Sequence, residues 1–367
     1  MRNDSNVSVD EPSGQQPIVK AHRSLWTRRP SKKAFLLLVV AVASYVLLSL
    51  VFPARPQPLR RPQSFYGVDN VTGFNSYVVP NIIHYVRFGK PNISFMEAVS
   101  MRSSYINHGP DEIIVHCDIC QLDGPYAYLV RDIPVLRLNK RMKPQTVFGL
   151  EVGGVEHASD ITRLQTLLRY GGMYLDGDCF VIQSVNRYRH FEMTIGWEYG
   201  AYMGSMILLA APSARFLHLY QQLYKEYNRS SWYYNAGDLP TMRVLWHHPH
   251  LIHRVPILIG IGYAMLYKLY NPGFHPDWRN YHVVHTFIRH RSAKADPLCG
   301  KEYDLQNIRT YNTSLGEMMR EVIFGTSEYV NDTAEVKGSY DLYVAKRKRS
   351  SPSLTTQNST DDASIRR

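Results

Sequence analysis

The chain has 367 residues, of which 44% are hydrophobic and 20% are charged. This composition excludes the disordered and collagen-like classes, and the length allows one large folded domain or two small ones. The formal net charge is +11, but segments 1–33, 53–76 and 345–367 together carry 16 Lys/Arg against 6 Asp/Glu and so hold 10 of these charges. The rest of the chain is nearly neutral, which argues against a basic face for nucleic acid. We therefore expect no nucleic-acid partner.

Residues 34–52 form an apolar run of 19 residues without a charge. As a helix this run would span ~28 Å, close to the thickness of a bilayer core. Six basic residues lie at 20–33 and three at 55–61, so the positive-inside bias places the N-terminus in the cytosol. A cleaved signal peptide is the alternative, although its apolar region usually has only about 7–15 residues. We predict a single-pass type II signal anchor.

This topology divides the chain into five parts. Residues 1–33 would be a cytosolic tail, 34–52 the transmembrane helix, 53–76 a Pro- and Arg-rich stem, 77–345 the lumenal domain, and 346–367 a disordered polar tail. Six Asn-x-Ser/Thr sequons follow the apolar run, the first at Asn70, and weakly support a lumenal location. The four cysteines also follow it and allow up to two disulfides in three pairings: Cys117, Cys120, Cys179 and Cys299.

Short apolar runs alternate with helical patterns along the lumenal part. Residues 81–88, 112–117 and 133–138 read as strands, while 95–106 and 157–170 read as helices. This alternation predicts an α/β fold with a mostly parallel central sheet, and such sheets bind ligands at the carboxyl ends of their strands.

Two carboxylates, Asp176 and Asp178, flank Gly177 directly after the apolar run 173–175. Their oxygens can face one hard divalent cation, Mn²⁺ or Mg²⁺. The alternative is structural: Asp-Gly would be a hairpin turn between strands at 173–175 and 180–183.

The residues before this turn carry a second pattern. Asp160-Ile-Thr-Arg163 is followed by Arg169-Tyr170-Gly171-Gly172-Met173-Tyr174-Leu175 and then by Asp176-Gly177-Asp178. The stretch 159–182 resembles the glycosyltransferase family with a DXD-containing sugar-binding region, which includes α-1,4-galactosyl- and N-acetylglucosaminyltransferases and yeast α-mannosyltransferases. A weaker resemblance covers 80–214. The resemblance to this family implies a GT-A-like nucleotide-sugar-binding domain, a divalent metal and retention of anomeric configuration.

The resemblance also implies roles for individual residues. Asp176 and Asp178 would be catalytic and would bind the metal, and His285 would be a third metal ligand unless it is an ordinary core or surface histidine. The donor would be contacted by Asp160, Arg163, Tyr170 and Glu198. Where relatives commonly have an Asn after this Glu, the chain has Gly204-Ser205. For Asp160 and Arg163 the alternative is a helix cap with an exposed partner three residues on.

These inferences predict a metal-dependent retaining hexosyltransferase of the Golgi membrane or the endoplasmic reticulum. The donor would be a nucleotide-sugar, UDP-hexose first and UDP-N-acetylhexosamine or GDP-mannose as alternatives, and the acceptor a glycan, glycolipid or glycoprotein. A catalytically silent, lectin-like or scaffolding relative is the alternative outside the enzyme class. The acceptor depends on loops that vary freely on one scaffold.

Overall fold

The computed structural model describes residues 64–65, 67–273, 278–292 and 296–350, with residues 33, 39, 40 and 44 besides. None of the helices in these residues is long and apolar enough to cross a membrane. The predicted cytosolic tail 1–33 and membrane span 34–52 fall almost wholly outside the described residues, and so do residues 351–367 of the predicted C-terminal tail.

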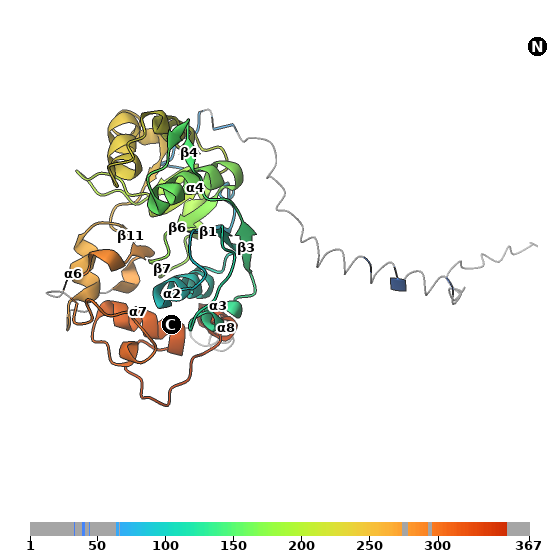
Figure 1. The fold of residues 1–367 in the computed structure, drawn as a ribbon, viewed down its shortest axis with the longest axis vertical. Coiled ribbons are helices and arrows are strands. Elements are labelled where there is room, and N and C mark those ends of the chain that lie inside the picture. Colours follow the sequence, from blue (N-terminus) through green and yellow to red (C-terminus); the bar gives the residue numbers. More distant parts are fainter. Residues whose placement is uncertain are drawn as a thin grey trace, which may run out of the picture. The chain divides into compact units, whose positions relative to one another are not determined.

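A seven-stranded sheet forms the centre of the described body (Figure 1). Its strands lie in the order β10-β8-β9-β6-β1-β2-β3. In chain order they are β1 (Ile82–Arg87), β2 (Glu112–Cys117), β3 (Leu136–Lys140), β6 (Gly172–Leu175), β8 (Met193–Ile195), β9 (Ile207–Ala210) and β10 (His253–Arg254). All neighbouring pairs are parallel except the two that involve β9. The predicted α/β class with a mostly parallel sheet is therefore confirmed.

Two smaller sheets complete the strands of the described residues. One has the order β11-β12-β7, made of β7 (Cys179–Val181), β11 (Ile259–Gly260) and β12 (Val283–His285). The other is the hairpin of β4 (Thr146–Val147) and β5 (Leu150–Glu151). Since β6 and β7 belong to different sheets, the Asp-Gly-Asp segment between them is not a hairpin turn, and that interpretation of the motif is wrong.

Helices pack on both faces of the central sheet. The α-helices are α2 (Phe95–Ser103), α3 (Tyr128–Arg131), α4 (Val155–Tyr170), α5 (Arg215–Leu223), α6 (Ala264–Tyr270), α7 (Ser314–Phe324) and α8 (Ser339–Ser350). The π-helical turns are η1 (Ser104–His108), η4 (Tyr234–Asp238) and η5 (Thr241–Leu245). The 3₁₀ turns are η2 (Asn186–His190), η3 (Tyr224–Glu226), η6 (Pro249–Leu251), η7 (Trp278–Asn280), η8 (Ile288–His290) and η9 (Asn307–Arg309).

Strand alternation separates the two large apolar cores of the described residues. On β6, Met173 and Leu175 pack into the core that contains α2 and α7, whereas Tyr174 between them packs into the core of α4 and α5. Successive strand residues point to opposite faces, so one short strand contributes to both cores. Figure 1 shows α4 and α2 on either side of β6 and β1. The helix with Asp160 and the strand that leads to Asp176 are thereby fixed against each other.

The body begins earlier than the predicted boundary at residue 77. Phe65 is buried, and Asn70 is only 2% exposed. This amide donates to the carbonyl of His250 at 3.1 Å, and its oxygen accepts from the backbone N–H of Glu192 at 3.0 Å. Phe65 and the segment around Asn70 therefore belong to the folded body rather than to the stem, and the sequon at Asn70 has no room for a glycan in the native fold.

The body also ends later than residue 345. Helix α8 continues to Ser350, because Lys346 donates to Oδ1 of Asn107 and Arg347 donates to the carbonyl of His108. In the same helix, the ring of Tyr343 stacks on that of Tyr105, with the ring centroids 5.0 Å apart. The basic segment that we expected to be disordered is thus helical up to residue 350.

The four cysteines form one disulfide, between Cys117 and Cys120. Cys179 is a buried free thiol and Cys299 a partly exposed one. The CxxC pair at the end of β2 is therefore a local crosslink.

Candidate active site

A cavity of about 1010 Å³ opens at the carboxyl ends of β1 and β6. Val86, Arg87 and Phe88 line it where β1 ends, and the segment 176–178 lines it where β6 ends. This is the edge at which parallel sheets bind ligands, because the chain leaves the strands there in loops. The volume lies at the upper end of the ~300–1,000 Å³ that ligand pockets usually have.

Asp176, Asp178 and His285 meet in this cavity. One ligand atom from each lies within 4.8 Å of the others. Nε2 of His285 is 3.1 Å from Oδ1 of Asp178, and Oδ2 of Asp178 accepts from the backbone N–H of Ile288 at 3.1 Å. The ring nitrogen Nδ1 of His285 is buried and has no hydrogen-bond partner in the described part of the chain. The structure thus brings together the three residues proposed as metal ligands.

The charges of this group are coupled. Burial would raise the pKa of Asp178, but the His285 imidazole and the N–H of Ile288 hold that pKa below its usual value. Burial would lower the pKa of His285, but the carboxylate of Asp178 raises it above the usual value. A protonated His285 therefore stabilises the Asp178 carboxylate, and a cation bound to both residues would displace that proton.

Two carboxylate oxygens and one imidazole nitrogen suit Mn²⁺ or Mg²⁺. Both hydrogen bonds to the Asp176 side chain go to Oδ1, from Arg163 at 3.0 Å and from Tyr174 at 2.6 Å. These bonds leave Oδ2 of Asp176 for a cation, and Nδ1 of the buried His285 ring has no hydrogen-bond partner in the described residues. The residues present therefore fit a divalent cation.

Arg163 connects α4 to the Asp-Gly-Asp segment. Its guanidinium lies 3.0 Å from both Oδ1 of Asp160 and Oδ1 of Asp176. It also donates to the carbonyl and to the hydroxyl of Ser205 at 2.8 and 2.7 Å. Burial raises the pKa of Asp160 to about 7, because Arg163 offsets burial only in part and Asp176 adds a like charge. Arg163 is thus a positioning residue for Asp176.

The helix-cap interpretation of Asp160 is wrong. Helix α4 begins at Val155 and is capped by Gly154, so Asp160 lies more than one turn inside it. The i,i+3 pair with Arg163 does form, but both side chains are buried rather than exposed. The helix began two residues earlier than the sequence indicated, because glycine rather than a polar side chain ends the preceding loop.

Glu198 and Tyr170 have different surroundings. Glu198 lines the cavity, as expected for a donor contact. Tyr170 does not line it: at the C-terminal end of α4 its ring lies against Arg169 and 6.3 Å from the ring of His84. Seven residues of helix place Tyr170 ~10 Å along the axis from Arg163, so the structure does not bring it together with the other predicted donor contacts.

Most residues of the cavity wall, including four of its Lys and Arg side chains, were not predicted from the sequence. All the Lys and Arg side chains that line the cavity in the described residues are paired with carboxylates. Arg87 and Lys90 lie 3.1 and 3.0 Å from Glu97, Arg289 lies 2.8 Å from Glu156, and Arg291 lies 2.9 Å from Asp296. The capping box of Ser94 and Glu97 was readable in the sequence, but its position beside the cavity was not.

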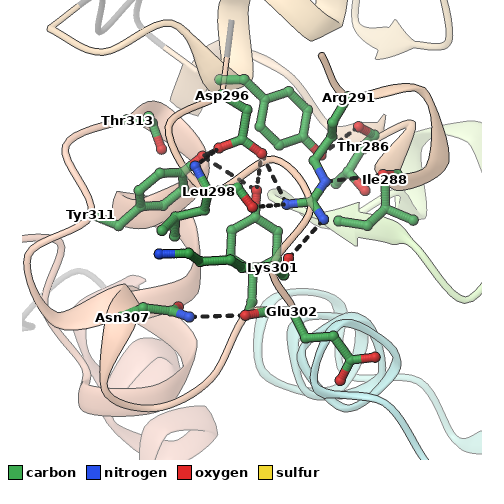
Figure 2. A network of polar contacts seen from close by, with 12 residues as sticks. Thr286, Ile288, Arg291, Asp296, Leu298, Lys301, Glu302, Asn307, Tyr311 and Thr313 are labelled. Atoms are coloured by element: carbon green, nitrogen blue, oxygen red, sulfur yellow. Dashed lines mark hydrogen bonds and ion pairs between the residues drawn. The ribbon is translucent and has the colours of Figure 1, made fainter. Parts of the chain in front are cut away.

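The pair of Arg291 and Asp296 is part of a dense polar network (Figure 2). Asp296 also accepts from the hydroxyls of Tyr303 and Tyr311 at 3.0 and 2.6 Å. Arg291 donates in addition to the carbonyls of Ile288 and Lys301. This network holds the segment after β12, and with it the Ile288 N–H that bonds Asp178.

Residues 125–199 match the family described as a glycosyltransferase sugar-binding region containing a DXD motif. The chain carries a DXD glycosyltransferase region. The match includes Asp160, Arg163, Asp176 and Asp178, and it confirms the predicted family and the glycosyltransferase class.

The chain is also similar to one fungal enzyme and to solved structures of glycosyltransferases. It is 25% identical over 173 residues to glucan organizing enzyme 1 of Cryptococcus neoformans var. grubii, covering 42% of this chain and 46% of that protein. The match thus spans about half of that relative's length. Among solved structures, galactosyltransferase LgtC with donor and acceptor sugar analogues has a TM-score of 0.35 at 13% identity, covering 66% of this chain and 94% of that one. The glycosyltransferase GlyE of Streptococcus pneumoniae has a TM-score of 0.40 at 10% identity, with 76% and 66% covered.

Proposed function

We propose that this protein transfers a hexose from a nucleoside-diphosphate sugar to a hydroxyl of a glycan, glycolipid or glycoprotein. The proposal rests on one observation above all: Asp176, Asp178 and His285 meet in a large cavity at the carboxyl edge of a mostly parallel sheet. UDP-hexose is the first candidate donor, and UDP-N-acetylhexosamine and GDP-mannose are the alternatives.

The charge balance of the cavity supports metal dependence. A donor diphosphate brings several negative charges, and the described Lys and Arg side chains of the cavity already face carboxylates. A divalent cation held by Asp176, Asp178 and His285 would neutralise the leaving diphosphate as its charge develops. The residues themselves supply the rest: Arg163 and Tyr174 orient the Asp176 carboxylate, and the Ile288 N–H orients that of Asp178.

Asp160 and Glu198 are the carboxylates that we propose for the donor sugar. Asp160 is held by Arg163, and Glu198 lines the cavity next to Gly262, where a Cβ would lie only 2.7 Å from Oε1 of Glu198. Carboxylates accept hydrogen bonds from sugar hydroxyls, and such charge-assisted bonds contribute about 1.5–3 kcal/mol. Retention of the anomeric configuration is part of the proposal, and NMR of the first-formed product tests it directly.

The proposed site of action is the lumen of the Golgi or of the endoplasmic reticulum, with the chain anchored as a type II protein through residues 34–52. The support is the charge asymmetry around that run and the disulfide between Cys117 and Cys120, which an oxidising compartment permits. Protease added to sealed microsomes should leave the body intact. Digestion of the body without detergent would contradict this topology.

The test of the activity is a nucleotide-sugar screen on the full-length protein in detergent, with Mn²⁺, with Mg²⁺ and with excess EDTA. Release of nucleoside diphosphate from one donor, abolished by EDTA, is the expected result. Release that is unchanged in EDTA would contradict the metal role. Binding of nucleotide-sugar without any turnover on any acceptor would favour a silent lectin-like relative.

A further inference from the structure

A row of aromatic rings leads from the metal-ligand group to the mouth of the cavity. The ring of Phe287 lies 4.2 Å from that of His285, and Tyr263 stacks on Phe287 at 5.0 Å. The ring of His290 then lies 5.6 Å from Tyr263 and 5.9 Å from Trp232. All five rings line the cavity. We call Trp232, Tyr263 and His290 the aromatic platform.

The rings of the platform are exposed, in contrast to the adjoining ring of Phe287. Trp232 is 56% and Tyr263 60% exposed, whereas Phe287 is buried. Large rings left in water at the mouth of a cavity lose the stabilisation that burial would give them, and such surfaces usually mark binding sites. Phe287 also has a left-handed backbone with φ of 53°, which is costly for a bulky residue and directs its ring between His285 and Tyr263.

The groups around the platform are polar and balanced in charge. Glu198 and Arg289 line the same cavity, and Arg289 is paired with Glu156 across 2.8 Å. Arg291, the next cation along this segment, is held by Asp296 in the network of Figure 2. An anionic sugar would require an unpaired cation, and the described lining has none. An uncharged sugar ring, with apolar faces and a polar edge, matches the exposed rings and this charge balance.

We propose that Trp232, Tyr263 and His290 form the acceptor subsite, which stacks a neutral sugar ring of an oligosaccharide or glycan. This inference rests on the proposed transfer reaction and specifies its acceptor as a carbohydrate. The platform adjoins the metal-ligand group through Phe287, so a sugar stacked on it would present a hydroxyl toward the donor. Trp232 and Tyr263 lie outside the matched region 125–199, as expected for an acceptor site built on variable loops.

The experiment uses the full-length protein in detergent on an array of neutral oligosaccharides, with sialylated and sulfated glycans on the same array. Trp232→Ala and Tyr263→Ala are compared with Trp246→Ala and Tyr267→Ala, which are similarly exposed at 56% and 57% but lie outside the cavity lining. Calorimetry with UDP and GDP in Mn²⁺ measures the donor site of each variant and shows that it is folded.

The expected result is that the wild-type protein binds a neutral saccharide and that each platform variant weakens this binding about 5- to 150-fold, the effect of losing one stacking ring. The two control variants should bind the saccharide as the wild type does, and nucleotide affinity should change less than about twofold in all four. Three results would overturn the inference: no saccharide binding that depends on Trp232, a preference for the anionic glycans, or an equal loss of nucleotide affinity, which would assign the rings to the nucleobase. Saccharide binding without hydrolysis of any nucleotide-sugar would contradict the transfer reaction and support the saccharide site.

Discussion

Nε2 of His285 lies 3.1 Å from Oδ1 of Asp178, although 107 positions separate the two residues in the chain. Strand β12 produces this contact, because it pairs antiparallel with β7 in a register that sets His285 opposite Cys179. The DXD segment and a distant histidine are thereby held as one ligand group before any cation binds.

Asp178→Asn and His285→Ala should each abolish metal-dependent transfer. Asn cannot supply the charge that a divalent cation requires, and Ala removes the nitrogen ligand, so we expect Mn²⁺ binding by calorimetry to weaken about 100-fold or more. Glu151→Gln, which changes an exposed carboxylate outside the cavity, is the control and should bind Mn²⁺ normally. Wild-type Mn²⁺ affinity in the His285→Ala variant would show that His285 is not a metal ligand but an ordinary core histidine.

Asp160→Asn and Arg163→Lys should differ in stability as well as in activity. Asp160→Asn leaves Arg163 paired with Asp176, so the melting temperature should change little while kcat/KM for the donor falls about 10- to 100-fold. Arg163→Lys cannot reach Asp160, Asp176 and Ser205 together and should cost about 3–5 kcal/mol of stability, as expected when a buried pair is broken. Unchanged donor kinetics in Asp160→Asn would remove Asp160 from the donor site.

The buried histidines His84 and His116 should make the fold sensitive to acid. Burial lowers the pKa of His84 to about 4 and that of His116 to about 2. Nδ1 of His84 contacts Nε2 of His116 at 3.1 Å, and the outer nitrogens bond Gly171 and Asn139, so both rings are held neutral. Because the unfolded chain takes up protons near pH 6.5 and the folded chain does not, each ring should cost about 1.4 kcal/mol per pH unit below 6.5.

Urea unfolding of the wild type and of His116→Asn between pH 7.5 and 5.5 measures this effect. The variant should be less stable at pH 7.5 but should lose stability less steeply below pH 6.5. His247→Asn, which changes an exposed histidine, should keep the wild-type slope. Equal slopes in all three proteins would mean that the buried rings do not set the acid sensitivity.

Asn70→Ala should destabilise the body, whereas Thr72→Ala should not. Both changes remove the same sequon, but only the first removes the buried amide that bonds His250 and Glu192. Two backbone groups left without partners should cost about 2–4 kcal/mol in urea unfolding. Neither change should shift the mobility on a gel when the protein is expressed in the secretory pathway of a host cell. A loss of glycan mass in Thr72→Ala would show that Asn70 is glycosylated and that the segment 64–76 is not packed as described.

Local patterns in the sequence predicted several residues of the site and the elements that hold them. The apolar run before Asp176 predicted a strand ending at a carboxylate pair, and β6 does end at Leu175. The helix predicted over 157–170 implied that Asp160 and Arg163 lie together, since residues three apart share a helix face. Such features depend on neighbours along the chain, which is why composition and spacing determined them.

Contacts between distant segments decided the rest. The pairing of β7 with β12 selected His285, the packing of Ser205 on Arg163 oriented Asp176, and Tyr170 was directed away from the cavity by the length of α4. The packing of Asn70 and Lys346 on the body depended on partners such as His250 and Asn107, far away in the chain. Sequence periodicity determines which face of an element is apolar, but the register and packing of whole elements determine which polar side chains meet, because those contacts form only when the chain folds back on itself.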